Sequence, residues 1–175
     1  MFLFYLRQTF RVVTLVALFL FFFRAFFYEP GLVNGRSMES AFQDDDFFLV
    51  NKWILLFREP RRGDVIQAYH VREDKVLLKR VIGLPGERLS IHDGFVFLID
   101  SSNQEQPLIE NYLDKNVRTQ TPENVTTSYT RIPPNHYFLM GDNRPMSGDS
   151  RGYGPVHRSL IYGLVTKPSV FSQKK

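Results

Sequence analysis

The 175-residue chain contains no cysteine, which excludes disulfide bonds and thiolate metal sites. Its four histidines are scattered, and no two of them have the spacing of zinc ligands. The first 28 residues lack acidic side chains but include Arg7, Arg11 and Arg24, and the rest of the chain carries 19 basic against 18 acidic residues. Such a charge balance argues against nucleic-acid binding. Because cysteines are absent and the histidines are scattered, we also expect no metal, and we expect no other cofactor.

Residues 12–28 form an apolar run that only Arg24 interrupts. A helix rises about 1.5 Å per residue, so this run nearly spans a roughly 30 Å hydrocarbon core, and Phe10 with a snorkelling Arg24 would extend it. A cleaved signal peptide is the alternative, because Arg7 and Arg11 precede the run, but no pair of small residues two apart follows it. We therefore expect an uncleaved transmembrane helix. The basic tail before it predicts a cytoplasmic N-terminus and a working domain outside the cytoplasmic membrane.

After the apolar run the pattern changes to short strands separated by turns, which predicts a mostly β domain. Glu29-Pro30-Gly31 is expected to end the helix. Strands are expected at 47–50, 65–69, 75–82, 95–99, 137–140 and 161–165. Residues 100–134 are polar and include four prolines, which is typical of an inserted lobe with a smaller core.

A separate apolar cluster at 53–57 shows no alternation of polar and apolar residues. It is either a buried strand or a segment that enters the outer membrane-water interface, where tryptophan is favourable. The sequence leaves both interpretations open.

Lys79 interrupts an aliphatic strand just before a Gly-Leu-Pro-Gly turn. Alternate residues of a strand share a face, so Lys79 and Arg80 point to opposite faces and at least one of these cations lies on an apolar face. A desolvated lysine has a depressed pKa and can hold a neutral amine near pH 7, which makes it a candidate general base. The alternative is a lysine whose stem lies along apolar surface with its ammonium in water.

Ser37 lies in a loop shortly after the apolar run and follows Gly35 and Arg36. A serine in such a loop usually caps the backbone or faces solvent, but it can also expose its hydroxyl beside backbone N–H groups that bind an oxyanion. With Lys79 it becomes a candidate Ser-Lys dyad, in which the neutral amine takes the hydroxyl proton and the oxygen attacks a carbonyl.

A third stretch, 140–151, combines glycines, acids, bases and short polar residues directly after an apolar strand. It is either a solvated turn with weak surface ion pairs, each worth at most about 1 kcal/mol, or a rigid loop that braces a catalytic amine. The position of the stretch favours the bracing loop.

Together these stretches resemble the bacterial type I signal peptidases, the membrane-anchored Ser-Lys proteases that remove signal peptides. The motifs that carry the resemblance follow the family's order: Gly35-Arg36-Ser37-Met38, Arg62-Gly63-Asp64, Lys79-Arg80-Val81-Ile82-Gly83-Leu84-Pro85-Gly86 and Gly141-Asp142-Asn143-Arg144 through to Arg151. The lysine motif and the last motif are long and specific.

The resemblance implies that Ser37 is the nucleophile and Lys79 the general base. It also implies that Ser147 orients the Lys79 amine by a hydrogen bond, and that Asp149 and Arg151 hold the same loop by an ion pair. Two further residues, Asp142 and Arg144, would support this loop.

Two positions depart from the family pattern. The Ser37 backbone N–H would give one oxyanion donor, but some members add a hydroxyl two positions earlier, where this chain has Gly35. The family usually has proline two residues after Met38, where this chain has Ser40, and the loss of a fixed φ would loosen the loop.

The family fold is a largely antiparallel β catalytic core with a second β lobe inserted into it. The resemblance and the composition together divide the chain into a cytoplasmic tail at 1–11, a transmembrane helix at 12–28, the first part of the core at 29–91, the inserted lobe at 92–134, the second part of the core at 135–170 and a polar tail at 171–175.

The resemblance also implies a single-pass protein of the cytoplasmic membrane, with its catalytic domain on the outer face. Its expected partners are secretory precursors with small residues, typically alanine, at the first and third positions before the cut, the lipid bilayer and the protein-export translocon. Three alternatives stay open: a catalytically silent relative that acts as a binding module, a related Ser-Lys maturation peptidase, and a Ser-His-Asp hydrolase.

Overall fold

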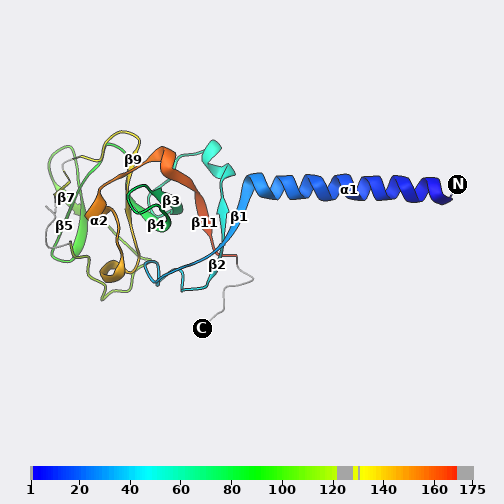
Figure 1. Ribbon diagram of the computed structural model, residues 1–175. Coiled ribbons are helices and arrows are strands. Elements are labelled where there is room, and N and C mark those ends of the chain that lie inside the picture. Colours follow the sequence, from blue (N-terminus) through cyan, green and yellow to red (C-terminus); the bar gives the residue numbers. More distant parts are fainter. Residues whose placement is uncertain (1, 122–127, 130, 169–175) are drawn as a thin grey trace.

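The computed structural model describes residues 2–121, 128–129 and 131–168. The polar tail expected at 171–175 and part of the expected insert lie outside these residues. One long helix, α1 (Phe2–Phe27), precedes two antiparallel sheets (Figure 1). The predicted mostly β fold with an N-terminal apolar helix is thus confirmed.

Within the described residues, the larger sheet has seven strands in the order β1-β2-β11-β3-β4-β9-β10. Their bounds are β1 Tyr28–Leu32, β2 Phe47–Asn51, β11 Ile161–Thr166, β3 Val65–His70, β4 Lys75–Gly83, β9 His136–Met140 and β10 Val156–His157. The smaller sheet has the order β7-β6-β5-β8, with bounds β7 Glu105–Pro107, β6 Phe95–Ile99, β5 Arg88–His92 and β8 Ser128–Tyr129. The short helices are η1 Trp53–Leu56, η2 Arg144–Met146, α2 Ser150–Tyr153 and η3 Arg158–Leu160.

The helix α1 extends away from the sheets (Figure 1). It contains an apolar segment, Phe4–Phe23, with a mean hydropathy of 1.6 and no part buried inside the protein. The helix begins well before residue 12, because 2–11 contain neither proline nor glycine to break it. It ends at Phe27, since the following residues pair with β2, and Pro30 is tolerated there because β1 lies at the edge of the sheet.

All six predicted strands are present, and each end lies within one residue of its prediction. The strand β5 was not predicted, although Leu89 and Ile91 alternate with polar residues and both are buried. The smaller sheet consequently begins at Arg88, four residues before the expected start of the inserted lobe.

The segment 53–57 is not a buried strand, so that alternative was wrong. It forms the 3₁₀ helix η1, which contains no buried residue, and the chain turns there between β2 and β3. Trp53 packs edge-on against Phe27 at the end of α1, with 4.4 Å between ring centroids.

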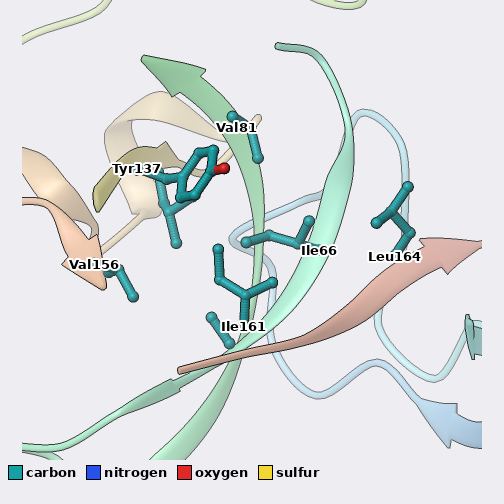
Figure 2. Close-up of a cluster of buried hydrophobic side chains, with 8 residues drawn as sticks. Ile66, Val81, Tyr137, Val156, Ile161 and Leu164 are labelled. Carbon is teal, nitrogen blue, oxygen red and sulfur yellow. The ribbon is translucent and has the colours of Figure 1, made fainter. Parts of the chain in front are cut away.

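Three clusters of buried side chains hold the fold together. The first packs β3, β4, β9, β10 and β11 (Figure 2) and consists of Ile66, Ala68, Val81, Tyr137, Leu139, Val156, Ile161 and Leu164. The second joins the two sheets and consists of Ile82, Leu89, Ile91, Val96, Ile132, Phe138 and Met140. The third surrounds the turn that carries Ser37 and consists of Val33, Met38, Phe42, Phe48, Val50 and Val165. The smaller sheet therefore shares its core with the larger one.

A substitution at Gly83 tests the packing between the two sheets. A Cβ at this position would lie 2.3 Å from Ile132 Cδ1 and 2.8 Å from Leu89 Cδ2. We expect Gly83→Ala to lower the free energy of unfolding by about 1–3 kcal/mol, because overpacking forces the shared core apart. Thermal unfolding of the full chain in detergent measures the change. Gly152→Ala is the matched control, because a Cβ there meets nothing within 4 Å, and an equal effect of both changes would contradict the packing.

Candidate active site

Ser37 and Lys79 meet although 42 residues separate them in the sequence. Ser37 lies in the turn between β1 and β2, whereas Lys79 lies in β4. The Lys79 Nζ donates a hydrogen bond of 2.7 Å to the Ser37 Oγ. Such a contact allows direct proton transfer between the hydroxyl and the amine.

The Lys79 side chain is almost entirely buried, with 3% of its surface exposed. Its register partner across the sheet is Ile66, so both residues point to the face covered by the first hydrophobic cluster. Burial lowers the pKa of the Lys79 amine from its ordinary 10.5 to about 8, against the opposing effect of the Asp149 carboxylate. The sequence alternative of a solvated ammonium on an apolar surface is therefore wrong.

The turn that carries Ser37 is fixed from both sides. On one side the Asn143 N–H donates to the Ser37 carbonyl at 3.0 Å. On the other side the Phe42 N–H donates to the Met38 carbonyl at 2.7 Å, and both of these side chains are buried. The turn is thus closed and packed, while the loosening expected from Ser40 stays a prediction.

The Ser37 backbone N–H donates no hydrogen bond to any part of the chain that the structure describes. It is therefore available to an oxyanion formed at Ser37. Gly35, two positions earlier, has no side chain, and its own N–H donates to the Asp44 Oδ1 at 2.7 Å. Its φ of +97° explains why glycine occupies this position.

Gly141 lets the last motif approach the nucleophile closely. A Cβ on Gly141 would lie 2.3 Å from the Ser147 Oγ and 2.4 Å from the Ser37 carbonyl oxygen. Ser147 is thereby placed near the Ser37 carbonyl. Its buried Oγ, however, has no hydrogen-bond partner within the described residues, so the expected bond to the Lys79 amine is not made in this structure.

Asp149 and Arg151 form a buried ion pair with two contacts, Nε to Oδ1 at 2.8 Å and Nη2 to Oδ2 at 2.7 Å. The same carboxylate accepts the Gly141 N–H at 3.1 Å. The Arg151 guanidinium also donates to the Arg144 carbonyl at 2.7 Å. This pair therefore ties both ends of the 141–151 loop together.

Asp142 pairs with Arg80, the residue next to Lys79. The two contacts are Nε to Oδ1 at 2.7 Å and Nη2 to Oδ2 at 2.5 Å, and the Asp142 side chain is fully buried. Arg80 also donates to the Gly63 carbonyl at 2.7 Å. The ion pair thus joins the strand that carries Lys79 to the 141–151 loop.

Arg144 reaches a group of residues that the sequence did not single out. Its fully buried guanidinium binds Glu110 through two contacts, one of them 3.0 Å, and also contacts the Thr119 hydroxyl. Its Nε donates to the Gly141 carbonyl at 3.1 Å. Tyr112 donates to Glu110 and stacks under the Arg80 guanidinium at 4.0 Å. Residues 110–119 therefore brace the site. In the sequence, the one signal of this bracing role is that Glu110 and Tyr112 stand close together in an otherwise polar stretch.

No histidine side chain in the described ranges binds Ser37, which removes the geometric basis for a Ser-His-Asp site. Buried His70 packs against Tyr153 instead, with 4.2 Å between ring centroids. The same residues contain no group of three histidine, aspartate or glutamate side chains that could hold a metal ion.

The dyad opens into a cleft of about 180 Å³. One wall is formed by 32–34, at the end of the edge strand β1, and the other by 76–79 of β4. Of the described strands only β3 pairs with this part of β4, because the pairing with β9 begins at Arg80. The cleft therefore lies between two strand edges that can accept an extended peptide.

The contribution of the Glu110–Arg144 ion pair to stability can be measured by removing the Glu110 carboxylate. Glu110→Ala would leave a buried guanidinium without its carboxylate, so we expect a loss of about 3–5 kcal/mol in the free energy of unfolding. Glu73→Ala, which breaks a solvent-exposed pair with Lys75, should change the free energy of unfolding far less. Thermal unfolding of both variants in detergent tests this difference, and equal losses would contradict the buried brace.

Known proteins resemble this chain in sequence and architecture. The family model described as signal peptidase, peptidase S26, matches residues 6–170. Signal peptidase I V of Bacillus subtilis (strain 168) is 31% identical over 138 residues, which cover 77% of this chain and 81% of that protein. Signal peptidase I of Bacillus caldolyticus is 32% identical over 146 residues, which cover 81% of this chain and 79% of that protein.

A crystal structure of a signal peptidase I from Enterococcus faecalis V583 is similar, with a TM-score of 0.51 and 33% sequence identity. The matched region covers 62% of this chain and 98% of the chain in the crystal structure. The resemblance inferred from the motifs is confirmed. Because the family model spans nearly all of its residues, the chain belongs to the signal peptidase family, peptidase S26.

Proposed function

We propose that this serine endopeptidase removes N-terminal signal peptides from exported precursors with Ser37 as its nucleophile and Lys79 as its general base. One observation carries the assignment. The Lys79 amine is buried, has a pKa of about 8, and lies 2.7 Å from the Ser37 hydroxyl at a cleft between two strand edges. No other group within the described residues hydrogen-bonds to this hydroxyl.

In the first half of the reaction, the neutral Lys79 amine accepts the hydroxyl proton as the Ser37 Oγ attacks the scissile carbonyl. The Ser37 N–H stabilises the oxyanion of the tetrahedral intermediate. The Lys79 ammonium then gives its proton to the amine of the mature protein, which leaves as the acyl-enzyme forms. In the second half, Lys79 deprotonates a water molecule, which attacks the ester carbonyl. The Ser37 Oγ then leaves, takes the proton back from the Lys79 ammonium, and the signal peptide is released with a free carboxylate.

The 141–151 loop would keep the amine in place during both halves. Two ion pairs, Asp149 with Arg151 and Asp142 with Arg80, occupy both carboxylates of this loop. Neither carboxylate is therefore free to form an ion pair with the Lys79 amine. We assign Ser147 the role of orienting the amine, because its buried hydroxyl lies near the Ser37 carbonyl and has no hydrogen-bond partner among the described residues.

The precursor would bind as an added strand between 32–34 and 76–79. Alternate side chains of an extended peptide point to the same face, so the first and third residues before the cut would enter the cleft together. A cleft of about 180 Å³ shared by two side chains admits small residues and rejects large ones by steric clash. This arrangement fits a preference for alanine at both positions.

Family membership and the exposed apolar helix α1 indicate a membrane anchor. We propose that the basic N-terminal residues stay in the cytoplasm and that the catalytic domain lies on the outer face of the cytoplasmic membrane. There it would meet precursors as they leave the export translocon, with their apolar segments still in the bilayer.

Cleavage of a secretory precursor with an Ala-x-Ala site tests the assignment. We expect the detergent-purified full chain to cut after the second alanine, and Ser37→Ala and Lys79→Ala each to lower kcat/KM by roughly a thousandfold or more. The matched controls Ser101→Ala and Lys115→Ala change exposed residues and should retain activity. An inert parent protein, or full cleavage by folded Lys79→Ala, would refute the dyad.

The acid limb of the pH profile should report Lys79. Because the pKa of the amine is lowered to about 8, the active neutral form is lost as the pH falls, and about one-tenth of it remains at pH 7. We expect kcat/KM to fall about tenfold per unit below this pKa. A profile that stays flat between pH 6 and pH 9 would argue against a lysine base.

A further inference from the structure

Most of the side chains that line the cleft beside the dyad are apolar. Its lining, apart from Ser37 and Lys79, consists of Leu32, Val33, Asn34, Met38, Phe48, Gln67, Val76, Leu77 and Leu78. Two of these residues carry amides. Asn34 is exposed at the rim, where water can satisfy its amide, whereas Gln67 is half-buried in the sheet.

Gln67 lies in β3, one strand inward from the free edge of β4. Its register partner is Leu78 on one side and Gly163 on the other. Directly paired residues point to the same face of a sheet, so the Gln67 side chain lies on the same face as Leu78. Val76, two residues before Leu78 in β4, also points to this face. The neighbour in β11 is a glycine, so no side chain on that strand covers the amide at this register position.

The Gln67 amide makes no hydrogen bond with any residue that the structure describes. A primary amide offers two donors and an acceptor oxygen, and it is poorly placed in an apolar wall without a partner. A peptide that fills the cleft would displace the water around it. The wall therefore favours a peptide that brings its own polar atom to this position.

We propose that Gln67 is a specificity-determining residue that hydrogen-bonds a hydroxyl on a small substrate side chain inside the cleft. Serine and threonine are the side chains that combine such a hydroxyl with a size close to that of alanine. The enzyme then accepts precursors with a hydroxyl residue at the first or third position before the cut. An entirely apolar wall would disfavour these precursors, because the hydroxyl would lose water without a replacement.

This inference rests on the proposed function, since it assumes that an extended precursor occupies the cleft. The second residue before the cut points to the opposite face from the first and third. A hydroxyl at the second position consequently cannot reach Gln67, which provides an internal control within the same substrate.

The test compares substrates with serine or alanine at the first, second or third position before the cut, changed one at a time. The full-length parent, Gln67→Met and Gln106→Met are assayed in detergent. Methionine keeps the length of glutamine without its amide, and Gln106 is an exposed glutamine on β7, so its replacement controls for the loss of an amide elsewhere. The readout is the ratio of kcat/KM for serine over alanine within each protein.

We expect this ratio to fall about tenfold in Gln67→Met at the first or third position, with no change at the second. Gln106→Met should match the parent at all three positions. Ratios that agree within about twofold among the three proteins at both cleft positions would overturn the role of Gln67. If the parent cuts no Ala-x-Ala substrate, the proposed function fails instead.

Discussion

The site depends on one desolvated amine. Lys79 lies on the face of β4 that the largest hydrophobic cluster covers, and its amine reaches the Ser37 hydroxyl at 2.7 Å. In water an ammonium with a pKa of 10.5 could not serve as a base at neutral pH, whereas burial lowers this pKa to about 8. The strand supplies the burial, and the turn around Ser37 supplies the partner.

A buried amine keeps a lowered pKa only if no carboxylate nearby is free to pair with it. In this protein each acidic group of the last motif already binds an arginine. Asp142 binds Arg80, and Asp149 binds Arg151. The pairing satisfies charges that are costly to bury alone, and it fixes the loop that places Ser147 near the Ser37 carbonyl. The inserted lobe contributes Glu110, which binds Arg144, so contacts from outside the last motif also hold this loop.

Local patterns made much of this predictable. The alternation of apolar residues located six strands, and the motifs that resemble the signal peptidases predicted that Ser37 and Lys79 lie in one site. Interactions between residues far apart in the sequence were harder to predict. Glu110 is an ordinary acid in a polar stretch until the fold brings it to Arg144, 34 residues away. The 53–57 cluster lacks a periodic pattern, and its 3₁₀ turn follows from the chain reversal after β2.

The most direct test of this account is the titration of the Lys79 amine itself. NMR of the full-length protein with ¹³C-labelled lysine, with Lys79→Met used to assign the signal, would follow the Cε resonance through the pH range. We expect one lysine signal that titrates near pH 8 and is missing from the variant. A Lys79 signal that titrates near the ordinary value of 10.5 would contradict the neutral amine, and with it the catalytic role of the dyad.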